Sequence, residues 1–160
     1  STGCDAEQTA KLMNQLGTEG HYTVTPEMKA KMADFCGGFA TEAEDAAAIR
    51  ELYDETGYVI DTHTGVASAV YQRYKKNTGD ETKTVIASTA SPYKFSRSVM
   101  EAISDEKLPE DEFAVIDELS RVSGVEIPKA VEEIRNAQIR HNLECDVQDM
   151  KKTVAKILGI

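Results

Sequence analysis

The chain has 160 residues, 41% of them hydrophobic and 29% charged, a composition typical of one globular domain with a real core. Its formal net charge of −10 argues against binding to nucleic acids or to anionic membrane surfaces, which need clustered Lys and Arg. No apolar run approaches the ~20 residues of a membrane-spanning helix, and no signal-peptide pattern is present. We therefore expect a cytoplasmic protein.

The cysteines support the same compartment. Cys4, Cys36 and Cys145 are widely spaced and form no C-x-x-C pair, which indicates reduced thiols rather than a disulfide framework. The three histidines lie far from one another, and only His141 has a cysteine nearby, Cys145, so we expect no metal site.

Helix signals recur along the chain. In the first half, capping residues and terminal glycines or asparagines predict helices over 5–16, 25–36, 41–56 and 62–76. In the second half, apolar spacing predicts helices over 95–103, 110–123, 128–135 and 147–158. Between the two halves, 84–88 is short, apolar and β-branched, as in a parallel strand covered on both faces. Residues 58–60 and 139–143 are further strand candidates.

The fold class depends on how the strand at 84–88 is completed. A covered strand needs neighbours on both sides to satisfy its backbone groups, and parallel neighbours need crossover helices. The chain is therefore either nearly all helical with a minimal sheet, or part of a larger α/β protein. We expect the second: a helix-rich α/β fold with a partial open parallel sheet whose partner strands are missing from this chain.

Two polar clusters are candidate functional sites. Asp61, Thr62, His63 and Thr64 stand at the start of a predicted helix, whose free amides can bind an anion or a polar ligand. The alternative is that an N-cap is followed by an exposed histidine.

The second cluster follows the predicted strand. Thr89 comes directly after 84–88, and in open α/β sheets ligands bind at the carboxyl ends of strands. The alternative is that Thr89 and Ser91 are turn residues, with Pro92 setting the entry into the next helix.

The two clusters together resemble the C-terminal part of threonine synthase. That family has motifs similar to Asp-Pro-His-Thr-Ala-Val and Thr-Ala-His-Pro-x-Lys-Phe, and this chain has Asp-Thr-His-Thr-Gly-Val at 61–66 and Thr-Ala-Ser-Pro-Tyr-Lys-Phe at 89–95. The segments "EDAAAIRELYDETGYVID", "IPKAVEEIRN" and "HNLECDVQDMKKTVAKIL" also look like family sequence. The departures are Thr62 for Pro, Gly65 for Ala and Ser91 for His.

The resemblance implies a pyridoxal-phosphate enzyme with the fold of tryptophan synthase β. Such an enzyme converts O-phosphohomoserine and water to threonine and phosphate. By the motif match, Thr89 corresponds to the hydroxyl that hydrogen-bonds the pyridine nitrogen of the cofactor. Asp61 and Ser91 are further cofactor-binding candidates, and His63, Thr64 and Lys94 are substrate-binding or structural candidates.

The catalytic residues implied by the family are not expected in this chain. The Schiff-base lysine and the glycine-rich phosphate loop belong to the N-terminal half of the family, and nothing here matches them. We expect 1–105 to be the C-terminal part of the cofactor-binding domain and 106–160 a helical extension with a short strand near 139–143. As part of a larger enzyme, the chain is expected to be inactive alone and to pair with the N-terminal half. Its exposed apolar surface is expected to lead either to a homodimer or to marginal stability. The alternatives are a helical interaction or regulatory module, and the C-terminal part of a sister enzyme such as a threonine dehydratase.

Overall fold

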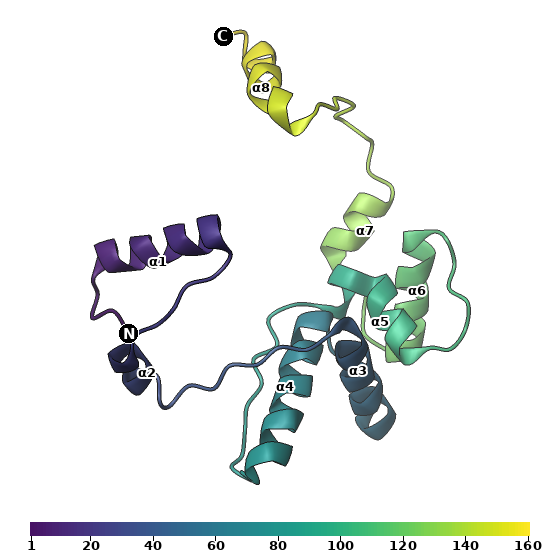
Figure 1. Ribbon diagram of the computed structural model, residues 1–160. Coiled ribbons are helices and arrows are strands. Elements are labelled where there is room, and N and C mark those ends of the chain that lie inside the picture. Colours follow the sequence, from purple (N-terminus) through teal and green to yellow (C-terminus); the bar gives the residue numbers. More distant parts are fainter.

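The computed structural model describes all 160 residues, and its regular elements are helices (Figure 1). Eight are α-helices and two are short 3₁₀ helices. In chain order they are α1 (Ala6–Glu19), α2 (Pro26–Lys31), α3 (Glu42–Thr56), α4 (Thr62–Thr78), η1 (Pro92–Phe95), α5 (Ser96–Ile103), α6 (Glu112–Ser123), α7 (Lys129–Arg135), η2 (Val147–Asp149) and α8 (Met150–Leu158).

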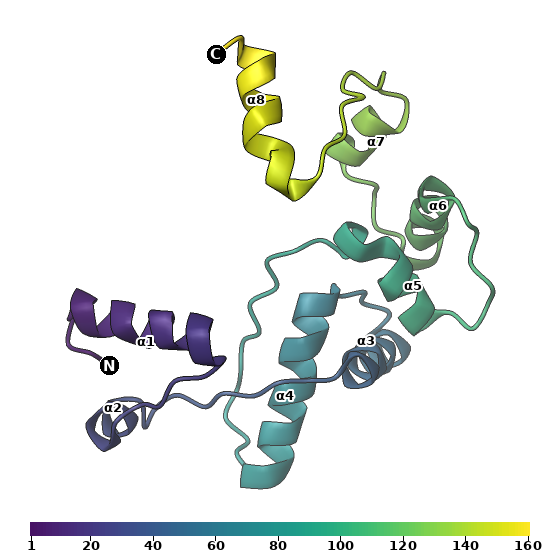
Figure 2. The same ribbon diagram turned by 45° about the horizontal axis from the view of Figure 1, so that its top comes forward.

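The core lies among α3, α4, α5 and α6. Helix α3 packs against both α4 and α5, and α5 packs in turn against α6 (Figure 2). Ile49 of α3, Val99 and Met100 of α5, and Val115 and Leu119 of α6 are each at most 1% exposed. Burying such side chains is the main favourable term in folding, so this four-helix unit carries most of the stability of the chain.

Local signals account for where these helices begin and end. The Thr41 hydroxyl accepts a hydrogen bond from the Glu44 amide, and the Glu44 carboxylate accepts one from the Thr41 amide, which is the reciprocal pattern of a capping box. At the other end of α3, Gly57 adopts a left-handed conformation and its N–H donates to the carbonyl of Tyr53. The predicted bounds of this helix are therefore confirmed.

The predicted parallel sheet is wrong, because the chain contains no strand. Residues 84–88 are extended, but no backbone ladder forms along them and Val85 is 93% exposed. Residues 58–60 connect α3 to α4, where Val59 and Ile60 fill the core without pairing, and 139–143 has no regular structure. A strand forms only where another segment accepts and donates along its edge, and no such segment lies beside these residues.

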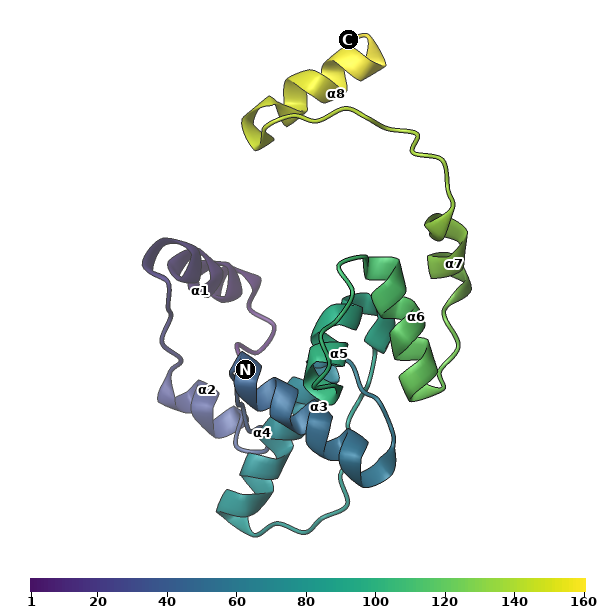
Figure 3. The ribbon, with the colours of Figure 1, turned by 90° about the vertical axis from the view of Figure 1, so that its right-hand side faces the viewer.

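The terminal helices lie apart from the core (Figure 3). Neither α1 nor α8 has a buried residue. The apolar face predicted for α8 is present but exposed, with Met150, Val154 and Leu158 at 54%, 52% and 64%. None of the helices is both long and apolar enough to cross a membrane.

Tyr93 anchors η1 to the loop after α6, and this contact gives a first prediction. Tyr93 is 6% exposed, and its hydroxyl donates to the carbonyl of Val125, which also accepts from Ser120 at 2.9 Å. We expect Tyr93→Phe to lower the free energy of unfolding by about 1 kcal/mol, because Val125 keeps its second donor. Urea unfolding followed by circular dichroism measures this loss. The control is Tyr58→Phe, since Tyr58 is 62% exposed; equal effects of the two changes would contradict the prediction.

Candidate functional site

Asp61 is the buried N-cap of α4. Its carboxylate is 1% exposed and accepts hydrogen bonds from the amides of His63, at 2.9 Å, and Thr64, at 3.4 Å. Burial raises the pKa of Asp61, but the hydrogen bonds from the Thr64 hydroxyl and the two amides, together with nearby His63, outweigh it and hold the pKa below its ordinary value. Asp61 is therefore a carboxylate that caps the helix.

A hydroxyl on the first turn of α4 joins the two sequence clusters. The Thr64 hydroxyl donates to the Asp61 carboxylate, and its oxygen lies 2.9 Å from Ser88 Oγ. We call Asp61, Thr64 and Ser88 the capping network. It fixes the segment before Thr89 to the start of α4, across 24 residues of sequence.

The rings of His63 and Phe95 form a second link between the clusters. Their centroids are 5.6 Å apart and their planes differ by 29°. His63 Nδ1 also lies 3.3 Å from Asp61 Oδ1, and Lys94 Nζ lies 5.5 Å from the centre of the Phe95 ring. The first turn of α4 and η1 are therefore held side by side, as a site shared by the two motifs requires.

Thr89 and Ser91 differ in how they are used within the chain. Ser91 caps η1 by accepting from the Tyr93 amide at 3.3 Å, so its hydroxyl has a structural partner. Thr89 is exposed, and its hydroxyl has no hydrogen bond to any other residue. Of the two, Thr89 has the hydroxyl that is free for a ligand.

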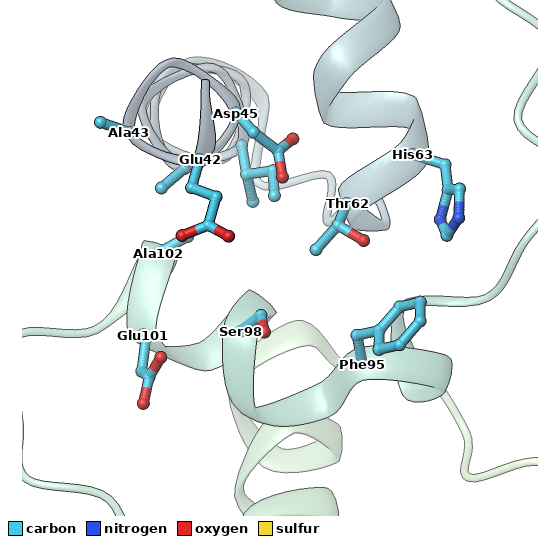
Figure 4. A pocket seen from close by; sticks show the side chains of 11 residues that line it. Glu42, Ala43, Asp45, Thr62, His63, Phe95, Ser98, Glu101 and Ala102 are labelled. Carbon is cyan, nitrogen blue, oxygen red and sulfur yellow. The ribbon is translucent and has the colours of Figure 1, made fainter. Parts of the chain in front are cut away.

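A pocket of about 620 Å³ lies beside the capping network, between α3, the start of α4 and α5 (Figure 4). His63 and Phe95 face each other at one side of it, and Glu42 and Asp45 reach in from α3 (Figure 4). Of the first polar cluster, Thr62 and His63 line this pocket, and none of the predicted cofactor-binding residues does. The pocket therefore adjoins the predicted cofactor-binding residues without containing Thr89.

Sequence reasoning missed three residues of this region. Ser88 is the last residue of the predicted strand, and its place directly before Thr89 is a signal that it belongs with the site. Phe95 is the last residue of the second motif, and its stacking on His63 depends on the tertiary fold. Asp45 lies in the first turn of α3, where a carboxylate is expected simply as a favourable charge near the helix N-terminus. The sequence therefore gives no sign that its Oδ1 atom is buried.

Comparison with known proteins supports the predicted resemblance. Residues 64–141 match a family described as threonine synthase, C-terminal. The threonine synthase of Schizosaccharomyces pombe is 35% identical over 101 residues, which are 62% of this chain and 20% of that protein. Human threonine synthase-like 1 is 31% identical over 107 residues, 66% of this chain and 14% of that protein.

The fold agrees with these matches. A crystal structure of pyridoxal-phosphate-bound threonine synthase from Brucella melitensis superposes with a TM-score of 0.53 and 22% identity, over 76% of this chain and 29% of that one. In fold and in sequence, the chain is thus similar to one region of larger proteins. The chain is related to the C-terminal part of threonine synthase, as its two motifs predicted. It spans 14% to 20% of the length of these curated relatives.

Proposed function

We propose that this chain is the C-terminal part of a threonine synthase, which converts O-phosphohomoserine and water to threonine and phosphate. The observation that carries the proposal is the joining of the two family motifs by the capping network and by the stacking of His63 on Phe95. Family similarity over 64–141 includes Thr64, Ser88 and Phe95, while Asp61 and His63 lie directly before the matched range. The N-terminal half of the enzyme would be the partner of this chain.

The residues present fit one side of a pyridoxal-phosphate site. When bound, this cofactor supplies an electron sink for carbanions of amino-acid substrates. The exposed hydroxyl of Thr89 is free to hydrogen-bond the pyridine nitrogen, and as a neutral group it would not hold that nitrogen protonated, as an aspartate would. Asp61 would position the site and not contact the cofactor, because both its oxygens already accept hydrogen bonds from α4. It holds Ser88, the neighbour of Thr89, through Thr64.

The remaining candidates receive different roles in this proposal. His63 is exposed on the pocket wall, at 61% of its side chain, and is placed to contact substrate. Ser91 and Lys94 belong to η1, Ser91 as its cap and Lys94 above the Phe95 ring, so we assign both to positioning the turn. The Schiff-base lysine and the phosphate loop would come from the N-terminal half.

Expression of a longer and a shorter polypeptide tests this function. The reading frame upstream of Ser1 is expressed with this chain as one polypeptide, and the 160-residue chain is expressed alone. We expect phosphate release from O-phosphohomoserine and the visible absorbance of bound cofactor from the long protein. From the short chain we expect neither, because the lysine that binds the cofactor is not identified in it. Cofactor-like absorbance or phosphate release by the short chain would contradict the proposal.

A helical interaction module is the second candidate, and one observation favours it. The core of α3 to α6 closes without any strand, so this unit needs no sheet from elsewhere to bury its apolar residues. On this reading the long protein would release no phosphate from O-phosphohomoserine. The experiment above therefore separates the two functions.

A further inference from the structure

Asp45 has an unusual environment that the proposed function does not use. It lies in the first turn of α3, and its Oδ1 atom is buried without any hydrogen-bond partner. Buried polar side-chain atoms nearly always have a partner, so an exception calls for an explanation. Arg135 Nε is the other buried side-chain atom in the chain without one.

The carboxyl of Asp45 occupies the space of a missing side chain on α4. Gly65 is in the first turn of α4, and a Cβ built there would overlap Asp45 Oδ1 and lie 2.8 Å from Cγ1 of Ile49. Gly65 has ordinary helical backbone angles, so glycine is needed here for space and not for conformation. Gly65, which stands where the family motif has Ala, thus leaves the space that the carboxyl of Asp45 occupies.

The charges around Asp45 come from three helices. Asp61 and His63 face it from the start of α4, while Glu42 of α3 and Glu101 of α5 line the same pocket. Burial raises the pKa of Asp45, and the negative charge of Asp61 raises it further, while His63 opposes this change. The charged form of Asp45 is therefore less favourable here than in an exposed aspartate.

We propose that Asp45 is a positioning residue, whose carboxyl, seated against the backbone of Gly65, fixes the first turn of α4 and with it the capping network. The pair lets α3 approach the start of α4 more closely than an alanine at position 65 would allow. The consequence for an enzyme rests on the proposed function, but the contact belongs to this chain and is tested in it alone.

A double-mutant cycle tests the contact. Gly65→Ala places a methyl group where the carboxyl sits, and we expect the equilibrium constant for unfolding to rise about tenfold. In an Asp45→Ala background the carboxyl is absent and only the contact with Ile49 Cγ1 remains, so the same change should cost clearly less. Urea unfolding measures all four proteins. The matched control is Gly17→Ala, a helical glycine with open space around it, which should not destabilise the chain. Additive effects of the two changes would overturn the proposal.

The pH dependence of stability is a second test, because a contact that acted through packing alone would not change with the ionisation of Asp45. Because the pKa of Asp45 is raised in the folded chain, stability falls as the pH rises from its ordinary value of 3.8 through the folded value. Asp45→Asn keeps the shape without the charge, so its stability relative to the parent chain should increase over this range. The amide NMR signals of Thr64 and Ser88 should shift with the ionisation of Asp45 in the parent chain and lose this shift in Asp45→Asn.

These NMR measurements also decide the outcome if Gly65→Ala fails to fold. The parent chain and Asp45→Asn contain no added atom that could prevent folding, so their pH titrations remain interpretable. Signals of Thr64 and Ser88 that titrate identically in both proteins would overturn a positioning role. A carboxyl signal of Asp45 that titrates at or below its ordinary value would overturn it as well.

Discussion

Replacing Asp61 with alanine is expected to lower the free energy of unfolding by about 2–3 kcal/mol, more than any other single hydrogen-bonding change in the site. The change removes a helix N-cap, which is worth about 1 kcal/mol, and the acceptor of the buried Thr64 hydroxyl, which costs about 1–2 kcal/mol. Thr64 is 6% exposed, so water does not readily replace the lost carboxylate. Urea unfolding by circular dichroism measures the loss.

A matched control separates the buried network from ordinary capping. Asp111 is the N-cap of α6 and accepts from the Ala114 amide at 2.8 Å, but it is exposed and has no buried hydroxyl beside it. Asp111→Ala should therefore cost only about 1 kcal/mol. Equal losses for the two aspartates would show that the capping network adds nothing to a simple N-cap.

The same aspartate should make the chain sensitive to acid. The pKa of Asp61 is lowered in the folded state, so its contribution is fully present above its ordinary value of 3.8 and is lost as the pH falls through the folded value. Asp61→Asn should lose less stability than the parent chain between pH 5 and pH 2. Asp45 acts in the opposite direction, because its raised pKa favours the folded state at low pH. The two changes therefore distinguish two carboxyls that lie beside the same helical turn.

The sequence predicted the helices well because their signals are local. The Thr41 capping box, Asp61 at the start of α4 and the glycine after each of these helices act within one turn of the chain. The helix from Thr25 was predicted too long: α2 ends at Lys31, well before the Gly37–Gly38 pair. Here the glycines followed a turn rather than ending the helix.

The sheet could not be predicted correctly, because a strand is a property of two segments. The β-branched run at 84–88 fits a pleated surface, but nothing lies beside it to complete the ladder. The buried pair Val59 and Ile60 shows the same ambiguity, since apolar residues without helical spacing also suit a connection that crosses a core.

In the site, the contacts within one helical turn could be predicted from the sequence, and the contacts between distant segments could not. Asp61 and Thr64 are three residues apart, so their contact follows from helix geometry. The hydrogen bond between Thr64 and Ser88 and the contact of Asp45 with Gly65 join distant segments, so they depend on how the chain packs and not on local sequence. The family resemblance indicated which turns belong together, but not which atoms would meet there.

Thr89→Ala in the long polypeptide is expected to reduce the rate of phosphate release from O-phosphohomoserine about 10- to 100-fold. We assign the Thr89 hydroxyl as the partner of the cofactor's ring nitrogen, and a lost hydrogen bond of this kind is worth about 1.5–3 kcal/mol. Thr89→Ser keeps the hydroxyl and should stay within about threefold of the parent enzyme. The visible spectrum of the bound cofactor should change in the alanine variant, because the ring nitrogen loses its partner.

The controls make this prediction specific to one hydroxyl. Thr89 is exposed and bonded to nothing in the chain, so Thr89→Ala should leave the unfolding of the 160-residue chain unchanged. Thr84 lies in the same extended segment, and its hydroxyl donates only to the carbonyl of Thr82, at 3.1 Å, so Thr84→Ala should leave activity and spectrum unaltered. Full activity and an unchanged spectrum in Thr89→Ala would refute the assignment of Thr89 while leaving the family relationship intact. Loss of activity in both Thr89→Ala and Thr84→Ala would instead mean that the extended segment as a whole, and not the hydroxyl of Thr89, supports the enzyme.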